Sequence, residues 1–194
     1  MIRRRRFCFA PLTAVTLSLV MPAMSFADNE VPASCPVTLP SAPAFVPPVP
    51  YPEKPSNTAA TFWHGTQELW TWLGSDGVFR GAASPSPLQP GAITTRNKQF
   101  FWSPGFHPIG TPNPQLKIKA RRLDGDAPDF KQPWVTNAHV PEWGGWTMLV
   151  MLDLPSLGCW EVTSAYNGNF LSFVVWVAPP KDGKLVPHHV PGPH

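Results

Sequence analysis

Residues 158–178, GCWEVTSAYNGNFLSFVVWVA, decide the fold class of this chain. Two apolar, aromatic-rich runs flank Asn167-Gly168, a dipeptide that tolerates the positive φ angles of a tight type I′ turn. The stretch therefore predicts an antiparallel hairpin. Its second run, residues 170–177, is apolar on both faces apart from Ser172, which predicts that other parts of the chain cover both faces.

Further short strands are predicted along the chain, separated by turn-rich loops. They are residues 61–63, 68–73, 78–80, 99–102, 115–123 and 146–154. The second and third of these are expected to form a hairpin, whereas residues 82–95 and 124–144 are expected to be irregular connections. No segment sustains a 3.6-residue apolar period, so the chain is predicted to be all-β. A single antiparallel, immunoglobulin-like sandwich of about seven strands explains the pattern best.

Residues 115–123 alternate between apolar and basic side chains. One face is predicted to carry Leu116, Ile118 and Ala120, and the other Lys117, Lys119 and Arg121. The basic face is interpreted as solvated sheet surface. At a sheet edge, its lysines would also discourage pairing with another chain.

The N-terminus has the features of an export signal. Residues 3–6 are four arginines, residues 7–24 are mostly apolar, and Ser25 and Ala27 offer small side chains at the −3 and −1 positions for cleavage after Ala27. An uncleaved membrane anchor is the alternative, against which two prolines in the apolar run argue. The arginines also resemble a twin-arginine signal, so the export route stays open.

Removal of this signal changes the charge balance. The precursor has 15 Lys and Arg against 12 Asp and Glu, and loss of four arginines leaves 11 basic residues and a net charge of about −1. The one dense basic cluster that remains is residues 117–122. The mature chain is therefore not expected to bind nucleic acid.

Cleavage also leaves two cysteines, Cys35 and Cys159, because Cys8 lies in the signal. An even pair in an exported protein predicts a disulfide. That bond would tie the N-terminal segment to the terminal hairpin. Two free thiols are the alternative.

The segment that contains Cys35 is rich in proline. Residues 31–55 hold nine prolines, namely Pro32, Pro36, Pro40, Pro43, Pro47, Pro48, Pro50, Pro52 and Pro55. Missing N–H donors and fixed φ angles exclude a helix or a central strand and leave an extended chain. We interpret it as a belt across the domain surface, held by Cys35 and by apolar residues such as Phe45 and Tyr51. A stiff spacer and a proline-rich ligand are the alternatives.

Four regions are thus expected. They are a signal peptide over residues 1–27, a proline-rich extended segment over 28–60, a β-sandwich domain over 61–178 and a flexible tail over 179–194. The protein is expected to be periplasmic or extracellular, and to meet a membrane only through an uncleaved signal segment.

Motifs for catalysis or cofactor binding are absent from the sequence, which contains no HExxH, CxxC, GxSxG, P-loop or dinucleotide glycine pattern. No cofactor is therefore expected. The histidines His64, His107 and His139 are candidate catalytic or zinc-binding residues only if their loops converge. His188, His189 and His194 in the C-terminal tail are candidates for loose metal binding. Carboxylates considered for a cation site or for glycoside hydrolysis are Asp124, Asp126 and Asp129, and Asp76 with Glu142.

Tryptophan is the one residue type whose abundance suggests a function, since the mature chain holds all nine. Four of them lie in or beside Pro- and Gly-rich loops, namely Trp102, Trp134, Trp143 and Trp146. Exposed indole rings are flat, rigid platforms on which sugars or peptide side chains stack. The alternative is that these rings plug the ends of the sandwich.

Several longer motifs resemble a family of uncharacterised exported bacterial proteins. They are CPVT, FVPPVPYP, FWHGTQELWTWL, KARRLDGDAP, GGWTMLV and GCWEVTSAYNGNFLSFVVWV, and together they span residues 35–178. The last motif is also similar to the terminal hairpin of bacterial immunoglobulin-like domains. The resemblance implies no activity and carries over no catalytic residue. Unlike a true immunoglobulin domain, the chain has no second cysteine within the sandwich.

These observations favour a non-catalytic protein of the cell envelope with a structural or protein-interaction role. A carbohydrate or cell-wall binding module that uses exposed tryptophans is the first alternative, and a hydrolase with a dispersed loop site is the second. The expected partner is accordingly an envelope protein or a glycan.

Overall fold

The hairpin predicted from residues 158–178 forms the centre of the smaller of two sheets. Strands β9 (Gly158–Tyr166) and β10 (Asn169–Val177) pair antiparallel over their whole length, with Tyr166 opposite Asn169. The two residues between them, Asn167 and Gly168, have φ angles of 49° and 82°. Both positive values are those of a type I′ turn, so the predicted hairpin is confirmed.

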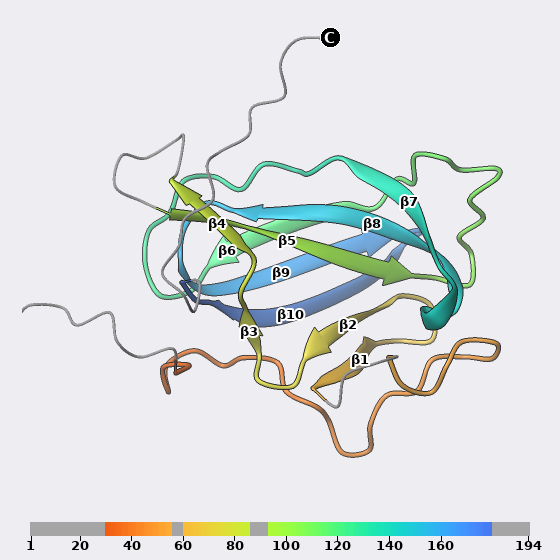
Figure 1. Cartoon of the computed structure of the whole chain (residues 1–194), viewed down its shortest axis with the longest axis horizontal. Helices are drawn as coiled ribbons and strands as arrows, with labels where there is room; N and C mark the ends of the chain where they lie inside the picture. Colours follow the sequence, from red (N-terminus) through yellow and green to blue (C-terminus); the bar gives the residue numbers. More distant parts are fainter. Residues whose placement is uncertain (1–29, 56–59, 86–92, 180–194) are drawn as a thin grey trace, which may run out of the picture.

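A computed structural model describes residues 30–55, 60–85 and 93–179 (Figure 1). Within them the chain forms ten strands in two sheets, which confirms the all-β sandwich. The four-stranded sheet has the order β3-β10-β9-β6, with β3 at Val78–Phe79 and β6 at Lys117–Arg122. In β6, Ile118 is buried and Lys117 and Lys119 are exposed, which confirms the predicted alternation at an edge of this sheet.

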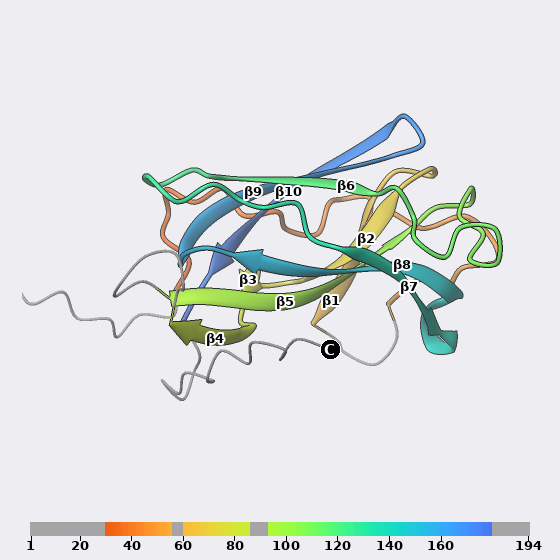
Figure 2. The same ribbon diagram turned by 90° about the horizontal axis from the view of Figure 1, so that it is seen from above.

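The six-stranded sheet has the order β1-β2-β5-β8-β7, and β4 pairs with the first half of β5. Its strands are β1 (Thr61–Gly65), β2 (Trp70–Gly74), β4 (Ala82–Pro85), β5 (Ile93–Trp102), β7 (Val135–Val140) and β8 (Gly145–Leu154). A single turn of 3₁₀ helix, η1 (Pro141–Trp143), joins β7 to β8. The two sheets lie face to face in Figure 2.

The core between the sheets is lined by alternate residues of the long strands. Trp160 and Phe173 from the smaller sheet, and Phe101 and Met148 from the larger, are almost completely buried. No helix in the described ranges is long and apolar enough to cross a membrane. The predicted signal peptide, residues 1–27, lies outside the described residues.

One predicted hairpin is wrong. Residues 68–73 do not pair with residues 78–80, because β2 pairs with β1 and β5, and β3 crosses to the other sheet to run parallel to β10. The Gly77 carbonyl accepts a hydrogen bond from the Trp176 N–H, and the Phe79 carbonyl accepts one from the Ala178 N–H. Pairing with a distant strand thus overrides the local turn signal.

Two predicted loops also contain strands. Residues 82–95 include β4 and the start of β5, and residues 124–144 include β7 and η1. Both β4 and β7 lie at edges of the sheet, where a strand can be short and half-exposed and where Pro85 is tolerated. Their weak apolar alternation is the reason the sequence pattern missed them.

The proline-rich segment lies across the sandwich, as the belt interpretation predicted (Figure 1). The predicted disulfide is present, with the Cys35 and Cys159 sulfur atoms 2.02 Å apart. Next to it, the Thr38 N–H donates to the Val174 carbonyl at 2.8 Å, and the Val174 N–H donates to the Thr38 hydroxyl at 2.8 Å. The Val37 side chain packs so closely on Gly77 that a Cβ there would lie 2.6 Å from it.

Together these contacts cover the outer edge of β10. Its carbonyls and N–H groups bond in succession to His64, Thr38, Gly77 and Phe79. A long apolar strand with an open edge is a template for aggregation, so this cover removes a hazard. The prediction that both faces of residues 170–177 are covered holds only in part. The inward residues Leu171, Phe173, Val175 and Val177 are buried and Val174 and Trp176 on the outer face are half-buried, but Phe170 on that face is 68% exposed, because the belt reaches only the end of the strand beside Cys159.

The turn of the central hairpin is tested by Gly168→Ala. A Cβ at Gly168 meets nothing within 4 Å, so any destabilisation comes from the positive φ alone. We expect the free energy of unfolding to fall by about 1–2 kcal/mol in urea titration. Gly110→Ala, in an exposed loop with only the His107 carbonyl near, at 4.0 Å, is the control and should be close to neutral. Equal effects at the two sites would contradict the assigned turn.

The belt disulfide is tested by the double variant Cys35→Ala and Cys159→Ala. The bond closes a loop with a sequence separation of 124 residues. Loss of that constraint is expected to lower the free energy of unfolding by up to about 4–5 kcal/mol. Reduced wild-type protein should unfold at the same urea concentration as the variant, and an unchanged midpoint in both would show that the bond does not hold the belt.

Candidate functional site

The four tryptophans proposed for ligand stacking occupy different environments. Trp102 is completely buried, and Trp143 is half-buried. Trp146 is 45% exposed and lies against His139, with the ring centroids 4.8 Å apart. Trp134 is 76% exposed. The prediction is therefore wrong for Trp102, which offers no ring face to a ligand, and Trp134 is the most accessible of the four.

Trp102 and Trp143 belong to an aromatic cluster on the outer face of the larger sheet. Phe101 in β5 and Leu73 in β2 point into the core. Because side chains alternate along a strand, Trp102 in β5 and Trp70 in β2 point to the outer face of the sheet. The cluster consists of Trp63, Trp70 and Trp102, packed against Phe45, Tyr51, Trp72, Phe100 and Trp143. Phe45 and Tyr51 come from the belt, which therefore closes this second apolar layer.

The rings of this cluster pack mainly edge to face. Trp63 and Trp102 are inclined at 80° with centroids 5.0 Å apart, and Tyr51 and Trp70 at 79° and 4.8 Å. The indole N–H groups of Trp70, Trp72 and Trp102 are buried and have no hydrogen-bond partner among the described residues. Edge-to-face contact places positive ring edges against neighbouring π faces, which stabilises the cluster. The cluster is structural.

Trp134 lies beside an open pocket of about 340 Å³ on the flank of the sandwich. Two extended segments form this pocket, residues 113–117 leading into β6 and residues 132–135 leading into β7. Amide side chains from Asn113, Gln115 and Gln132 line it, together with Lys117. A flat aromatic ring and several hydrogen-bonding groups therefore share one hollow.

Gln132 fixes the two sides of this pocket to each other. Its side-chain oxygen accepts the Ile118 N–H at 2.6 Å, and its side-chain nitrogen donates to the Leu116 carbonyl at 3.3 Å. The amide thus pairs with the open edge of β6 as a neighbouring strand would. Immediately after Trp134, the buried Val135 anchors the chain in the core. The backbone that carries the Trp134 ring is held on both sides.

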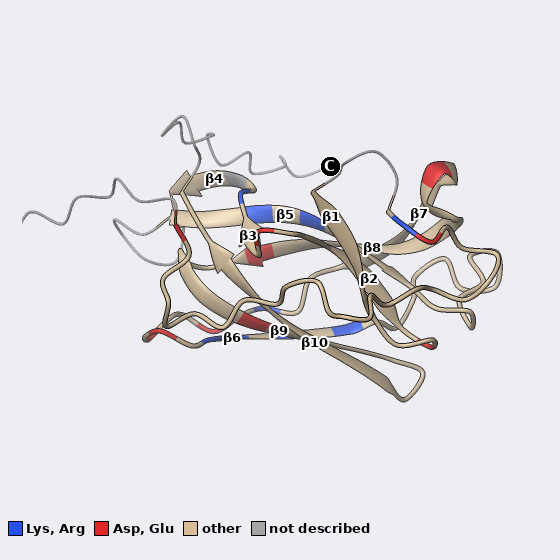
Figure 3. Cartoon of the chain, turned by 90° about the horizontal axis from the view of Figure 1, so that it is seen from below, with Lys and Arg blue, Asp and Glu red and all other residues tan. Residues whose placement is uncertain are grey.

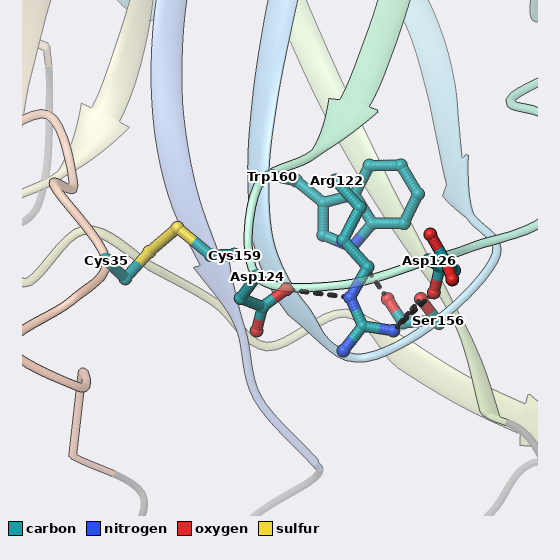
Figure 4. Close-up of polar contacts among 7 residues, drawn as sticks. All are labelled: Cys35, Arg122, Asp124, Asp126, Ser156, Cys159 and Trp160. Carbon is teal, nitrogen blue, oxygen red and sulfur yellow. Dashed lines mark hydrogen bonds and ion pairs between the residues drawn. A yellow bond between two sulfur atoms is a disulfide. The ribbon is translucent and has the colours of Figure 1, made fainter.

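Two of the acidic residues considered for a cation site take part in a structural network around Arg122, Asp124 through its carboxylate and Asp126 through its main-chain carbonyl, whereas Asp129 is not part of it (Figure 4). The Arg122 guanidinium donates to the Asp124 carboxylate at 2.7 Å, to the Asp126 carbonyl at 3.1 Å and to the Ser156 hydroxyl at 3.4 Å. The Trp160 indole donates to the Ser156 carbonyl at 3.0 Å. This network ties the loop after β6 to the loop before β9. Across the described ranges, no group of three or more His, Cys, Asp or Glu could hold a metal.

The remaining polar candidates lie apart from one another. The His64 ring bonds the Ser172 carbonyl at 2.9 Å, His107 is exposed in a loop, and His139 packs on Trp146. Burial alone would raise the pKa of Asp76, but hydrogen bonds from Arg80 and from the Val78 N–H lower it below its usual value. Asp76 is thus paired with the Arg80 guanidinium. His188, His189 and His194 lie outside the described residues.

Comparison with protein-family models, curated proteins and solved structures finds no match for this chain. The resemblance to exported bacterial proteins therefore stays a prediction. Sequence reasoning included Trp134 among four candidates, but it missed Gln132, Asn113 and Gln115. Nothing in the local sequence marked these amides, because their role depends on the approach of residues 113–117 to residues 132–135.

Burial of Tyr51 by the belt predicts a loss of stability at high pH. Burial raises the pKa of Tyr51 above its ordinary value of 10.0, so the folded state holds this proton more tightly than the unfolded state. The associated stability is complete below pH 10 and is lost as the pH rises through the folded pKa. Urea titrations at increasing pH should show this fall in wild type and a smaller one in Tyr51→Phe. An equal fall in wild type and in Tyr51→Phe would contradict a buried Tyr51.

Proposed function

We propose that the protein is an exported, non-catalytic module of the cell envelope with a structural or protein-binding role. The observation that carries this proposal is a group of exposed apolar side chains at one end of the sandwich. Ile109 is 99% exposed, Phe170 is 68% exposed, and Trp146 is partly exposed. A partner that covered these side chains would remove their apolar area from water, which favours association.

The segments that carry these three residues lie toward the same end of the sandwich (Figure 2). Phe170 follows the β9–β10 turn, Ile109 lies in the loop after β5, and Trp146 is the second residue of β8. The loop contacts the hairpin through the Phe106 and Tyr166 rings, whose centroids are 6.5 Å apart. It contacts β7 through a 3.3 Å hydrogen bond from the Asn137 side chain to the Pro112 carbonyl.

The rest of the fold supports a scaffold role in an oxidising compartment. The Cys35–Cys159 disulfide is of the kind that persists outside the cytosol. Belt contacts cover the β10 edge, and the Gln132 side chain pairs with the β6 edge, so association through side chains is favoured over strand pairing.

Binding of carbohydrate or cell wall is the second candidate function, and the environment of Trp134 favours it. An exposed indole beside a pocket lined with amides suits a sugar, which offers both an apolar ring face and hydroxyl groups. The two candidate functions use different parts of the surface and can be tested separately.

The first proposal predicts that charge at the exposed end disrupts association. The variant Ile109→Asp with Phe170→Asp should fold normally, because both side chains are exposed in the isolated protein. In cells, its chemical crosslinks to a discrete envelope partner should fall at least tenfold, and the mature protein should begin after Ala27.

The matched control is Leu39→Asp, which places the same charge on an exposed apolar position of the belt. It should keep the crosslinks of wild type. Identical crosslinks in all three proteins would contradict a docking role for this end, and an unprocessed chain in the cytosol would contradict export.

A further inference from the structure

The Trp134 side chain is held in a position where it does not contribute to the core. At 76% exposed, it leaves most of its apolar area in water, whereas Trp70, Trp102 and Trp160 are fully buried. A large exposed ring is an unused source of binding energy, because covering aromatic area is among the strongest contributions to recognition.

The backbone on both sides of the ring is also held in place before any ligand arrives. Pro133 precedes it, Val135 is anchored in the core, and Gln132 bonds both to Leu116 and to Ile118 across the pocket. Because this backbone is already ordered, binding there does not require the segment to be ordered first, which favours affinity.

The polar groups around the ring select the kind of ligand. Asn113 has no hydrogen bond from its side chain to other described residues, and Gln115 uses only its nitrogen, to the Asn113 carbonyl at 3.2 Å. Amide groups with free donors and acceptors match the hydroxyls of a sugar. The pocket volume of about 340 Å³ lies at the small end of ligand sites, which run from about 300 to 1,000 Å³.

Charge on this flank is positive. Lys117 is the one charged side chain among the described residues that line the pocket, and it forms no ion pair with any of them. Lys119 continues the exposed face of β6, and Lys131 is exposed next to Gln132. Arg121 on the same face is already paired with Glu161 at 2.7 Å. Figure 3 shows the basic residues along β6.

We infer that this pocket binds a pyranose glycan that carries carboxylate groups, that is, an acidic polysaccharide. The C–H face of one sugar ring stacks on Trp134, its hydroxyls bond to the free amide groups of Asn113 and Gln115, and a carboxylate lies near the Lys117 ammonium. This inference rests on the carbohydrate-binding candidate function and adds to it the site and the charge of the ligand.

The test is calorimetric titration of the mature protein with two probes, tetragalacturonate and the neutral cellotetraose, at low ionic strength. Wild type should bind tetragalacturonate more tightly. Trp134→Ala should lower the affinity for it at least about tenfold, since aromatic contacts at the centre of a site contribute the most. Lys117→Ala should lower it roughly threefold to fivefold and leave any binding of cellotetraose unchanged, because an exposed ion pair contributes modestly.

Two matched controls separate the site from the general surface. Lys119→Ala removes the next lysine on the same face but outside the pocket, and Trp146→Ala removes the other exposed tryptophan. Trp146→Ala should bind tetragalacturonate as wild type does, and Lys119→Ala should lose clearly less affinity than Lys117→Ala, because Lys119 contributes only to the longer-range field. Equal losses in Lys117→Ala and Lys119→Ala would overturn the site in favour of a diffuse charge effect.

The remaining outcomes distinguish this inference from the function on which it rests. Equal affinity for the two probes, lost in Trp134→Ala, would overturn the acidic ligand and leave carbohydrate binding standing. Binding that survives Trp134→Ala would overturn the site alone. If neither probe binds to folded wild-type protein, both the inference and the carbohydrate-binding function are wrong.

Discussion

The attachment of residues 31–55 to the central hairpin is the constraint on which the rest of the structure depends. Strand β10 is apolar on both faces and lies next to the very short strand β3, so most of its outer edge would otherwise be open. The disulfide fixes Cys35 to β9, and the paired hydrogen bonds between Thr38 and Val174 align the belt with that edge. From this fixed start, the belt continues to the opposite sheet, where Phe45 and Tyr51 close the aromatic cluster.

This arrangement explains how a chain with so many aromatic residues remains a folded module. Most of its indole rings are used in two apolar layers, the core between the sheets and the cluster between the larger sheet and the belt. The apolar side chains that stay exposed are then informative. Leu39, Val46 and Val49 lie on the belt, and the others lie at one end of the sandwich and beside the flank pocket. The proposed functions are assigned to the last two surfaces.

Local sequence signals predicted the parts of the fold that depend on neighbouring residues. Asn167-Gly168 specified its turn, alternation specified β6, and the cysteine count specified the disulfide. Signals failed where a distant partner decides the outcome: β3 leaves its predicted hairpin to pair with β10, and the edge strands β4 and β7 carry little alternation. The candidate tryptophans could not be ranked from sequence for the same reason, because Trp102 is buried by residues of the belt and of η1 that are far from it in the chain.

Amide hydrogen exchange at β10, before and after reduction of the disulfide, tests most directly whether the belt holds the central hairpin. The Val174 N–H bonds to the belt through Thr38, whereas the N–H of the next residue toward the turn, Phe173, alternates to the β9 side. We expect reduction to speed exchange at Val174 at least tenfold, while Phe173 stays protected as long as the sandwich remains folded. Unchanged exchange at Val174 would contradict the account, because the edge of β10 would then be protected without its belt.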